Sequence, residues 1–496
     1  MPSFFTFLLL YGSLLLLTPW RVDGQCNMLE IPGNSIDEDC DGFDDFFLHL
    51  PPYIYLAPGE PFELFFHHTI LSGHPADYSF DLSTPLGGIS DAEKWTITPT
   101  DTQSGEHTLL LSVRTPEGVV LDSASTTIRV SKADLPVDTA TRKLLLIGHS
   151  FFDQGYSPFY LRELLLQDSN PTVTFHGKRQ SWIDNQLRFE AIAGASWGYY
   201  STDGQSPMYY DSQLDLRNYF DMVIGPEKTP DWIIIHLDIN DYCFTGFLDG
   251  SSIEAIDNYI NVVYAARIKP FINALRAAAP TTKIGISYTP YPSASVESFQ
   301  LAFGVSPVLS DRDRWRLIVS RLLFKNSEFF ADRETENIYL LPIHLNLDDI
   351  NDYSITDPIH PHPTPGGASI SGPSGYRRIA RTYYSWLRYL MVGVAQPDSM
   401  PTTVTSAVQY TSISIFPNPA TDHIVIKDLD PLDGPVQVAV FNPDGRLVLE
   451  RTWPPAGFHR LEIDLGELPG GPYLLRITRS DHITVFKRLI VAPRSP

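Results

Sequence analysis

The sequence predicts a multidomain chain in which an α/β three-layer sandwich with a parallel sheet is flanked by two all-β sandwiches. The chain has 496 residues, which exceeds the size of one compact core and indicates about three domains. From residue 143 to 393, short apolar runs alternate with long amphipathic stretches, a pattern typical of a parallel sheet covered by helices on both faces. Short alternating runs separated by turn residues precede and follow this region and predict β-sandwiches.

Composition excludes some classes of partner. Hydrophobic residues make up 43% of the chain, as in ordinary globular proteins. The balance of 36 basic and 58 acidic residues gives a formal charge of −22, which disfavours nucleic acid and anionic membrane surfaces. Neutral or weakly charged substrates are therefore expected.

Residues 1–24 have the length and apolar core of a signal peptide. Val22 and Gly24 occupy suitable −3 and −1 positions, so we expect cleavage before Gln25. A membrane anchor is the alternative, but the apolar segment is short for a span and no later stretch is long and apolar enough. We therefore predict export, with no membrane span in the mature chain.

The chain has three cysteines. In an exported protein Cys26 and Cys40 are expected to form a disulfide that closes a small acidic loop. Cys243 is left over, and we interpret it as a buried structural thiol rather than a nucleophile, because no His follows it at a telling spacing.

Residues 25–47 form an acidic segment that contains these first two cysteines. Its carboxylates surround a glycine turn, and a hard cation such as calcium takes oxygen ligands from a loop of this kind. The segment resembles short calcium-binding repeats of secreted bacterial proteins, but a solvated acidic stub remains the alternative. The candidate ligands are Asp37, Asp39 and Asp41.

Residues 48–132 contain short alternating runs separated by turns such as Pro58-Gly59, which predict an immunoglobulin-like β-sandwich. Residues 133–138 form a linker. In the α/β region that follows, we expect strands at 144–147, 172–175, 232–237, 284–288 and 338–342, and helices within 252–279, 312–330 and 376–392.

Ser150 lies at the corner between the apolar run 144–147 and a helical pattern from 151 to 167. At such a corner a side chain points into the crevice beyond the strand's carboxyl end, and the helix offers unpaired N–H groups to an anion. Ser150 is therefore a candidate nucleophile. A purely structural helix N-cap is the alternative on this stretch alone.

Four stretches of the α/β region carry residues suited to catalysis. Three of them close a strand and so converge on one edge of the sheet. The stretches are 148–150 (Gly-His-Ser), 190–197 (around Gly194), 231–241 (ending in Asn240-Asp241) and 357–361 (Asp-Pro-Ile-His-Pro).

Together these stretches resemble the four sequence blocks of the SGNH, or GDSL-type, serine hydrolases across residues 143–393. The resemblance implies that Ser150 is the nucleophile and that Asp357 and His360 complete the catalytic triad. It also implies an oxyanion hole formed by the N–H of Ser150, the N–H of Gly194 and the amide of Asn240.

The chemistry requires these residue types. A hydroxyl needs a neutral imidazole to take its proton, and a carboxylate three residues away can fix the tautomer of that imidazole. An oxyanion needs rigid hydrogen-bond donors. His362 competes with His360 for the role of base, but it lacks the spacing from Asp357, so we expect it to be a surface residue.

Two residues depart from the family pattern. His149 stands where the family has Asp, and Asp238 stands where it has Gly. The first change is expected to alter hydrogen bonds at the corner, and the second to place a Cβ and a carboxylate beside the oxyanion hole, where a negative charge would oppose catalysis. A non-catalytic carbohydrate-binding protein on a degenerate scaffold is therefore an alternative.

Aromatic residues are candidates for stacking on a sugar, although packing under a long loop is an equal alternative. The pattern around Gly194 resembles that of secreted esterases that deacetylate carbohydrates. The candidates are Trp182, Trp197, Tyr199 and Tyr200.

Residues 394–411 form a linker rich in Pro, Ser and Thr, and residues 412–496 return to a β pattern with a Pro443-Asp444-Gly445 turn. This segment resembles the carboxyl-terminal sorting domain of the type IX secretion system. The resemblance implies that the secretion machinery is a partner and that the protein passes through the periplasm to the cell surface or medium. A structural or carbohydrate-binding sandwich is the alternative.

The sequence as a whole predicts a secreted serine esterase that hydrolyses acyl esters, acetyl esters of carbohydrate in particular, or a small-molecule ester. A lipase- or thioesterase-type acyl hydrolase is a further alternative. No cofactor is expected in the chemistry, and calcium is expected only in a structural role.

Overall fold

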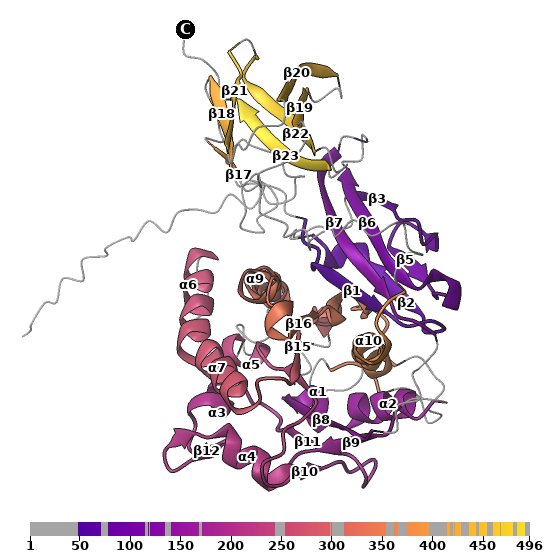
Figure 1. Ribbon diagram of the computed structural model, residues 1–496, viewed down its shortest axis with the longest axis vertical. Helices are drawn as coiled ribbons and strands as arrows, with labels where there is room; N and C mark the ends of the chain where they lie inside the picture. Colours follow the sequence, from indigo (N-terminus) through magenta and orange to yellow (C-terminus); the bar gives the residue numbers. More distant parts are fainter. Residues whose placement is uncertain are drawn as a thin grey trace, which may run out of the picture.

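The computed structural model describes most of the chain from residue 48 to 491. The described ranges are 48–70, 78–114, 118, 120–133, 140–167, 171–243, 253–297, 299, 312–353, 362–365, 374–395, 414–416, 420, 422–427, 436–442, 446–453, 460–466, 468–479 and 484–491. The predicted signal peptide, the acidic segment 25–47 with Cys26, Cys40, Asp37, Asp39 and Asp41, and nearly all of the linker 394–411 lie outside them. Multiple sheets and a mixed α/β arrangement are confirmed (Figure 1).

The central unit is built on a seven-stranded sheet. Its order is β10-β11-β8-β14-β15-β16, with β9 also paired to β8, and its pairings are parallel except that of β10 with β11. The strands are β8 (Arg142–Gly148), β9 (Val173–His176), β10 (Arg179–Gln180), β11 (Arg188–Ala191), β14 (Trp232–His236), β15 (Lys283–Ser287) and β16 (Ile338–Leu341).

Apolar side chains of β8 alternate between the two faces of the sheet. Leu145 and Ile147 join one apolar cluster, whereas Leu144 and Leu146 join another. Both faces are therefore covered, which is why this strand is aliphatic at four consecutive positions. Helices α3 (Trp197–Thr202), α4 (Leu216–Val223), α6 (Ile253–Val263), α7 (Lys269–Ala278) and α9 (Arg312–Phe330) contribute to the first cluster, and α1 (Ser150–Asp153), α2 (Tyr156–Leu165) and α10 (Gly375–Val392) to the second.

Smaller elements complete this unit. They are the hairpin β12 (Tyr209–Tyr210) and β13 (Gln213–Leu214), helix α5 (Ile239–Tyr242), and the single turns η5 (Tyr264–Ile268), η6 (Glu334–Glu336) and η7 (Ile343–Asn346). The helix expected after Ser150 is broken into α1 and α2, because Gly155 adopts a φ of +79° that a right-handed helix cannot contain. The strands and helices expected at 144–147, 232–237, 312–330 and 376–392 agree with the observed elements to within a residue or two.

The amino-terminal unit consists of two sheets that share one apolar core. One sheet has the order β1-β7-β6-β3 and the other β2-β5-β4, and residues of both meet in that core. The elements are β1 (Tyr53–Leu56), β2 (Phe62–Phe65), η1 (Phe66–His68), β3 (Ser79–Ser83), β4 (Ile89–Ser90), β5 (Lys94–Ile97), η3 (Asp101–Gln103), β6 (Gly105–Arg114) and β7 (Val120–Val130).

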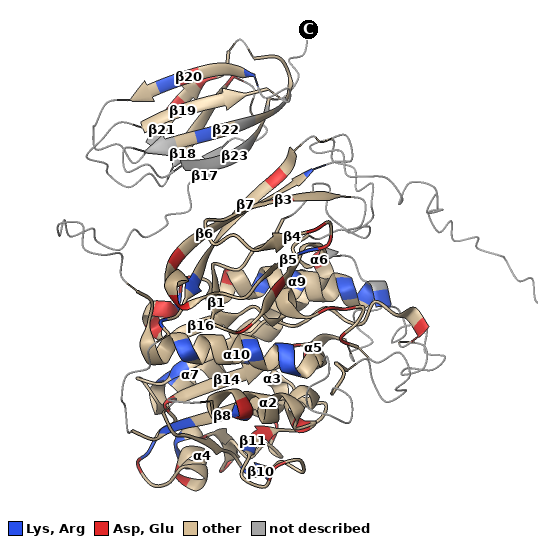
Figure 2. Cartoon of the chain, turned by 90° about the vertical axis from the view of Figure 1, so that its right-hand side faces the viewer, with Lys and Arg blue, Asp and Glu red and all other residues tan. Residues whose placement is uncertain are grey.

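Strand β1 joins this unit to the central one. Ile54 and Leu56 face the core between the two sheets, whereas Tyr55 packs into the apolar cluster formed with α10. Figure 1 shows the amino-terminal strands lying over α10, and Figure 2 shows the basic residues along that helix. The amino-terminal sheets are therefore packed onto the α/β unit as part of one continuous interior.

The carboxyl-terminal unit also contains two antiparallel sheets around an apolar core. Their orders are β17-β18-β21 and β20-β19-β22-β23. The strands are β17 (Ser414–Phe416), β18 (His423–Lys427), β19 (Val436–Phe441), β20 (Leu447–Trp453), β21 (Arg460–Asp464), β22 (Gly471–Arg479) and β23 (Thr484–Val491).

Within the described part of the chain, no helix has the length and apolar character needed to cross a membrane.

Arg129 on β7 provides a test of how the first two units are joined. Its side chain is about one-tenth exposed, its Nη1 donates to Glu334 Oε2 at 2.7 Å, and its guanidinium lies 3.6 Å from the ring centre of Tyr53. Replacing Arg129 with Ala leaves the carboxylate of Glu334 without this partner. We expect Arg129→Ala to lower the free energy of unfolding by about 3 kcal/mol, measured by urea denaturation.

Arg114→Ala is the matched control. Arg114 also pairs with a carboxylate in the same sheet, but the side chain of its partner Asp81 is 62% exposed. Its loss should therefore change stability by less than about 0.5 kcal/mol. Equal effects of the two substitutions would show that the Arg129 contact does not hold the units together.

Candidate active site

Ser150 begins α1 directly after the central strand β8. Gly148, at the end of β8, is packed so tightly that a Cβ there would come within 2.6 Å of the Phe152 ring and 2.9 Å of the His236 carbonyl oxygen. The chain can therefore turn at this point only with a glycine. The turn places the half-buried Ser150 at the carboxyl edge of the parallel sheet, where the sequence predicts it.

A histidine lies at hydrogen-bond distance from this serine. The Nε2 atom of His362 is 2.9 Å from Ser150 Oγ. The expectation that His362 is a surface residue is wrong, because its ring is half-buried and packs edge-on against Phe151 at 5.3 Å between ring centres. A nucleophile and a general base in contact are the central requirement of serine-based acyl transfer.

Asp357 and His360, which the sequence assigns as acid and base, lie outside the described residues. Their roles remain predictions. In the described segment 362–365, His362 supplies the imidazole that contacts Ser150. The Asp-x-x-His spacing pointed to His360, so spacing alone did not identify His362.

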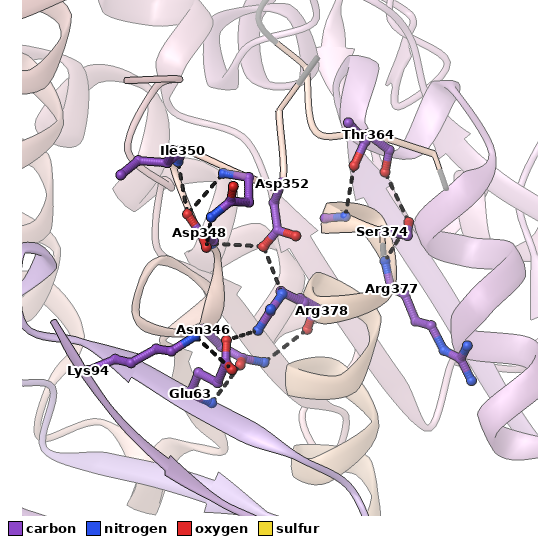
Figure 3. Close-up of polar contacts among 12 residues, drawn as sticks. Glu63, Lys94, Asn346, Asp348, Ile350, Asp352, Thr364, Ser374, Arg377 and Arg378 are labelled. Carbon is purple, nitrogen blue, oxygen red and sulfur yellow. Dashed lines mark hydrogen bonds and ion pairs between the residues drawn. The ribbon is translucent and has the colours of Figure 1, made fainter. Parts of the chain in front are cut away.

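The segment that carries His362 is held by backbone contacts on both sides. Pro363 forms an isolated β-bridge with Tyr353, and Thr364 N donates to the carbonyl oxygen of Asp352 at 2.6 Å. Ser374 Oγ donates to the Thr364 carbonyl oxygen at 2.9 Å, so the start of α10 holds the same segment (Figure 3). These contacts fix the chain on which His362 sits.

A network of charged side chains extends this support to the amino-terminal unit (Figure 3). Arg378 Nε lies 2.8 Å from Asp352 Oδ2, and its Nη1 contacts Glu63 on β2. Burial raises the pKa of Asp352 to about 6, although Arg378 opposes the shift. Asn346 Oδ1 also accepts a hydrogen bond from the Glu63 N–H at 3.0 Å. Strand β2 thus contributes to the position of the active-site segment.

The predicted oxyanion donors lie beside Ser150. Gly194 adopts a φ of +80°, which a residue with a Cβ rarely takes. Asn240, the second residue of α5, donates one amide hydrogen to the carbonyl oxygen of Ala195 at 2.8 Å. This bond fixes the amide plane, and Ser150, Gly194 and Asn240 all line one cavity. The structure brings these three predicted residues together.

The cavity has a volume of about 440 Å³ and is largely apolar beyond the catalytic edge. Its far wall was not anticipated from the sequence. It is formed by residues that follow β15 and by α9, together with Tyr353, and its members are Thr289, Pro290, Tyr291, Pro292, Trp315, Val319 and Tyr353. The position of residues 289–292 at the carboxyl end of a parallel strand is a signal that could have identified part of this wall.

Asp238 does not direct a free charge at the oxyanion hole. Its backbone adopts a φ of +79°, a conformation that favours glycine. Its side chain is buried, where Oδ1 accepts a hydrogen bond from Trp197 Nε1 and Oδ2 accepts one from Asn326 Nδ2 at 2.8 Å. Burial raises its pKa to about 6. The departure at 238 is thus accommodated by two donors in the interior.

His149 is buried next to Ser150. Its Nδ1 accepts a hydrogen bond from Phe151 N at 3.3 Å and lies 3.4 Å from Ser150 Oγ. Burial, together with His236 and His362, lowers the pKa of His149 well below its usual range. The ring is therefore neutral near pH 7 and caps the first turn of α1, as the sequence anticipated for a mainly structural position.

The predicted sugar-stacking aromatics do not line the cavity. Trp197 and Tyr200 are fully buried, and Tyr200 Oη donates to the carbonyl oxygen of Glu190 at 3.0 Å, so their proposed role in substrate binding is wrong. Tyr199 is half-buried, and its hydroxyl donates to the carbonyl oxygen of Gln205. Trp182 is 68% exposed and lies against Tyr156, away from the cavity lining. For Trp197 and Tyr200 the structure supports the alternative interpretation, in which these aromatic side chains pack under the loop.

Cys243 is buried and free, and burial raises its pKa well above the usual range for a thiol. A thiol in this state is a poor nucleophile, in agreement with the structural role expected for it.

Comparison with known families accounts for the carboxyl-terminal unit. Residues 414–492 match the model of the secretion system C-terminal sorting domain. The chain carries a type IX sorting domain. This domain directs the protein through the secretion machinery to the cell surface or the extracellular space, as its sequence predicts. None of its described residues lines the active-site cavity.

Solved structures similar to this chain include a GDSL-like lipase and a phospholipase. A platelet activating factor protein from Streptococcus pneumonia is 18% identical, with 51% of this chain and 86% of that chain covered and a TM-score of 0.29. A GDSL-like lipase from Parabacteroides merdae is 13% identical (52% and 99% covered, TM-score 0.25), and phospholipase A1 from Streptomyces albidoflavus is 12% identical (50% and 98% covered, TM-score 0.27). No curated protein sequence matches the chain. The assignment of the site rests on its own geometry.

Asp238→Asn tests the buried carboxyl beside the site. The folded-state pKa of about 6 lies above the ordinary value of 3.8, so the folded chain binds this proton more tightly than the unfolded chain does. The contribution of Asp238 to stability is therefore greatest below about pH 4 and decreases as the pH rises to about 6. An Asn at this position does not titrate.

We expect the free energy of unfolding of the wild type, relative to that of Asp238→Asn, to decrease by roughly 3 kcal/mol between pH 4 and pH 7. Urea denaturation at a series of pH values measures this difference, in which the other carboxylates cancel. If the free energies of unfolding of the two proteins changed with pH in the same way, the raised pKa of Asp238 in the folded chain would be contradicted.

Proposed function

We propose that this protein is a secreted serine esterase with Ser150 as nucleophile. The observation that carries the proposal is the 2.9 Å contact between Ser150 Oγ and His362 Nε2, at the edge of a cavity that also contains Gly194 and Asn240. A non-catalytic binding protein would not require a serine and an imidazole in contact beside two oxyanion donors.

In the proposed mechanism His362 takes the proton of Ser150 as Oγ attacks the ester carbonyl. The resulting oxyanion accepts hydrogen bonds from the N–H groups of Ser150 and Gly194 and from the second amide hydrogen of Asn240. The imidazolium then protonates the leaving alcohol. Water, activated by the same imidazole, releases the acid and regenerates Ser150.

The other sequence-based assignments complete the proposal. Asp357 is the proposed carboxylate of the triad, with His360 as the alternative base. The central unit is proposed to be a three-layer α/β sandwich of the SGNH type, flanked by an immunoglobulin-like sandwich and the sorting sandwich. No cofactor takes part in the chemistry, and calcium bound by Asp37, Asp39 and Asp41 is a proposed structural ion.

The residues that line the cavity are compatible with two classes of ester substrate. Tyr291 and Trp315 contribute aromatic rings to the lining of the cavity, and aromatic linings are compatible with the acetylated carbohydrate that the sequence predicts as substrate. Pro290, Ile239 and Val319 give the same cavity an apolar lining that a longer acyl chain would fill, and this favours a lipase-type hydrolase as the second candidate. Turnover measured on acyl chains of increasing length, beside acetylated oligosaccharides, separates the two.

Substitutions at residues 150, 362 and 360 test the mechanism. We expect Ser150→Ala and His362→Gln each to lower kcat on a short acyl ester by about 10⁴-fold, with little change in KM, because nucleophile and base act only in the chemical step. His360→Gln is the matched comparison in the same segment, and it should lower kcat less than about 10-fold if His362, which contacts Ser150 Oγ, is the base.

The outcomes are distinct. If His360→Gln is severe and His362→Gln is mild, the base is His360, as the sequence spacing implies. If Ser150→Ala turns over the ester as fast as the wild type, the serine mechanism is wrong.

A further inference from the structure

A second cluster of functional side chains lies where the amino-terminal unit meets the α/β unit. His67 and His68 come from η1, which follows β2, and Asp349 comes from the segment after η7. The Nε2 of His67 is 2.8 Å from Asp349 Oδ1, and the Nε2 of His68 is 3.5 Å from the same oxygen. Three potential ligand atoms of these residues lie within 4.8 Å of one another.

The tautomer of His68 follows from its other ring nitrogen. His68 Nδ1 is 2.8 Å from the carbonyl oxygen of His344. A carbonyl oxygen can only accept, so Nδ1 carries a hydrogen and donates it. This is the backbone contact that typically orients a histidine whose other nitrogen binds a metal.

The Nε2 atom of His68 has no hydrogen-bond partner although the residue is only 1% exposed. It faces a carboxylate oxygen at 3.5 Å, whereas a charge-assisted hydrogen bond between such groups is about 2.7–2.9 Å long. A nitrogen lone pair and a carboxylate at this distance repel each other unless a proton or a metal cation lies between them. The 3.5 Å separation is compatible with two ligand atoms of one metal ion.

The surroundings hold these ligand atoms in place. Arg316 Nη1 lies 3.9 Å from the other oxygen of Asp349, and its Nη2 donates to the His67 carbonyl oxygen at 2.7 Å. The guanidinium therefore occupies the outer side of the carboxylate and leaves Oδ1 to the two imidazoles. The His68 ring also stacks on Tyr291, with 4.8 Å between ring centres and an interplanar angle of 26°.

We propose that His67, His68 and Asp349 bind one divalent transition-metal ion of the zinc type. Two imidazole nitrogens and one carboxylate oxygen form a ligand set that suits zinc, whereas calcium requires oxygen ligands. The side chain of His67 is 21% exposed, which gives water access to the fourth coordination position.

The ion would join two parts of the chain that lie more than 280 residues apart in sequence (Asp349 and His68 differ by 281 positions). It would also lie close to Tyr291, whose ring stacks on His68 and which lines the active-site cavity. Its role is to fix the amino-terminal unit on the α/β unit and to hold the Asp349 segment, which leads to Tyr353 and its bridge to Pro363. It takes no part in the chemistry of Ser150.

The test uses the full chain without an affinity tag, stripped of metal by a chelator and then titrated with Zn²⁺ against a chromophoric competitor. We expect His68→Gln to weaken binding of one Zn²⁺ per chain about 100-fold or more, because loss of an orienting partner alone weakens a metal site by about 10–100-fold. Zn²⁺ should raise the midpoint of thermal unfolding of the wild type but not of this variant.

His49→Gln is the matched control. His49 is a buried histidine at the same interface, with Nε2 at 2.8 Å from Ser327 Oγ, and it lies outside the proposed ligand set. This variant should bind Zn²⁺ as the wild type does. If His68→Gln fails to fold, His67→Gln at the partly exposed ligand takes its place.

Equal Zn²⁺ affinity in the wild type and the ligand variants would overturn the proposal. So would a thermal midpoint that changes with pH but not with Zn²⁺, since a proton would then hold the cluster together. Binding is measured without turnover, so a failure of the proposed esterase activity leaves this inference intact.

Discussion

Burial of strand β8 on both of its faces is the constraint on which the site depends. With Leu144 and Leu146 on one side and Leu145 and Ile147 on the other, the strand cannot shift its register without disrupting the packing of both clusters. The chain must therefore leave the sheet at Gly148, where close packing against Phe152 and the His236 backbone admits no side chain. Ser150 is placed by this turn.

The parallel neighbours of β8 bring the remaining groups to the same edge. Ala191 of β11 and His236 of β14 pair with Gly148, so the segments that follow them, with Gly194 and Asn240, emerge beside Ser150. The sequence could predict this part of the site, because apolar runs identify buried parallel strands and the polar residues after them share one edge. The choice of Gly194 and Asn240 among the residues of these segments came from the sequence resemblance to the SGNH hydrolases.

Other parts could not be read from the sequence. An Asp-x-x-His spacing suggested His360, but which imidazole of the 357–362 segment reaches the serine depends on the bridge between Pro363 and Tyr353 and on contacts with α10. In the same way, nothing local distinguishes an aromatic that lines a cavity from one that packs in a core. Trp197 packs in the apolar core, where its indole N–H donates to Asp238, a partner 41 positions away. The wall formed by Tyr291 and Trp315 likewise required the tertiary fold.

The amino-terminal unit is tied to the active-site segment. Glu63 on β2 contacts Arg378, which holds Asp352, and the Asp352 backbone in turn holds Thr364, two residues from His362. Sequence patterns predicted this unit only as a separate β-sandwich. The structure shows it to be part of the support of the catalytic segment, through contacts between residues that are remote in sequence and therefore carry no local signal.

The most direct test of the account is covalent labelling of the secreted protein with an alkyl fluorophosphonate, followed by peptide mass spectrometry. An activated serine between a neutral imidazole and preorganised oxyanion donors is expected to be phosphonylated, so the account predicts one adduct per chain, on the peptide that contains Ser150. An ester-hydrolysing protein that carries no adduct, or carries it on another residue, would contradict the assignment of Ser150 as the nucleophile.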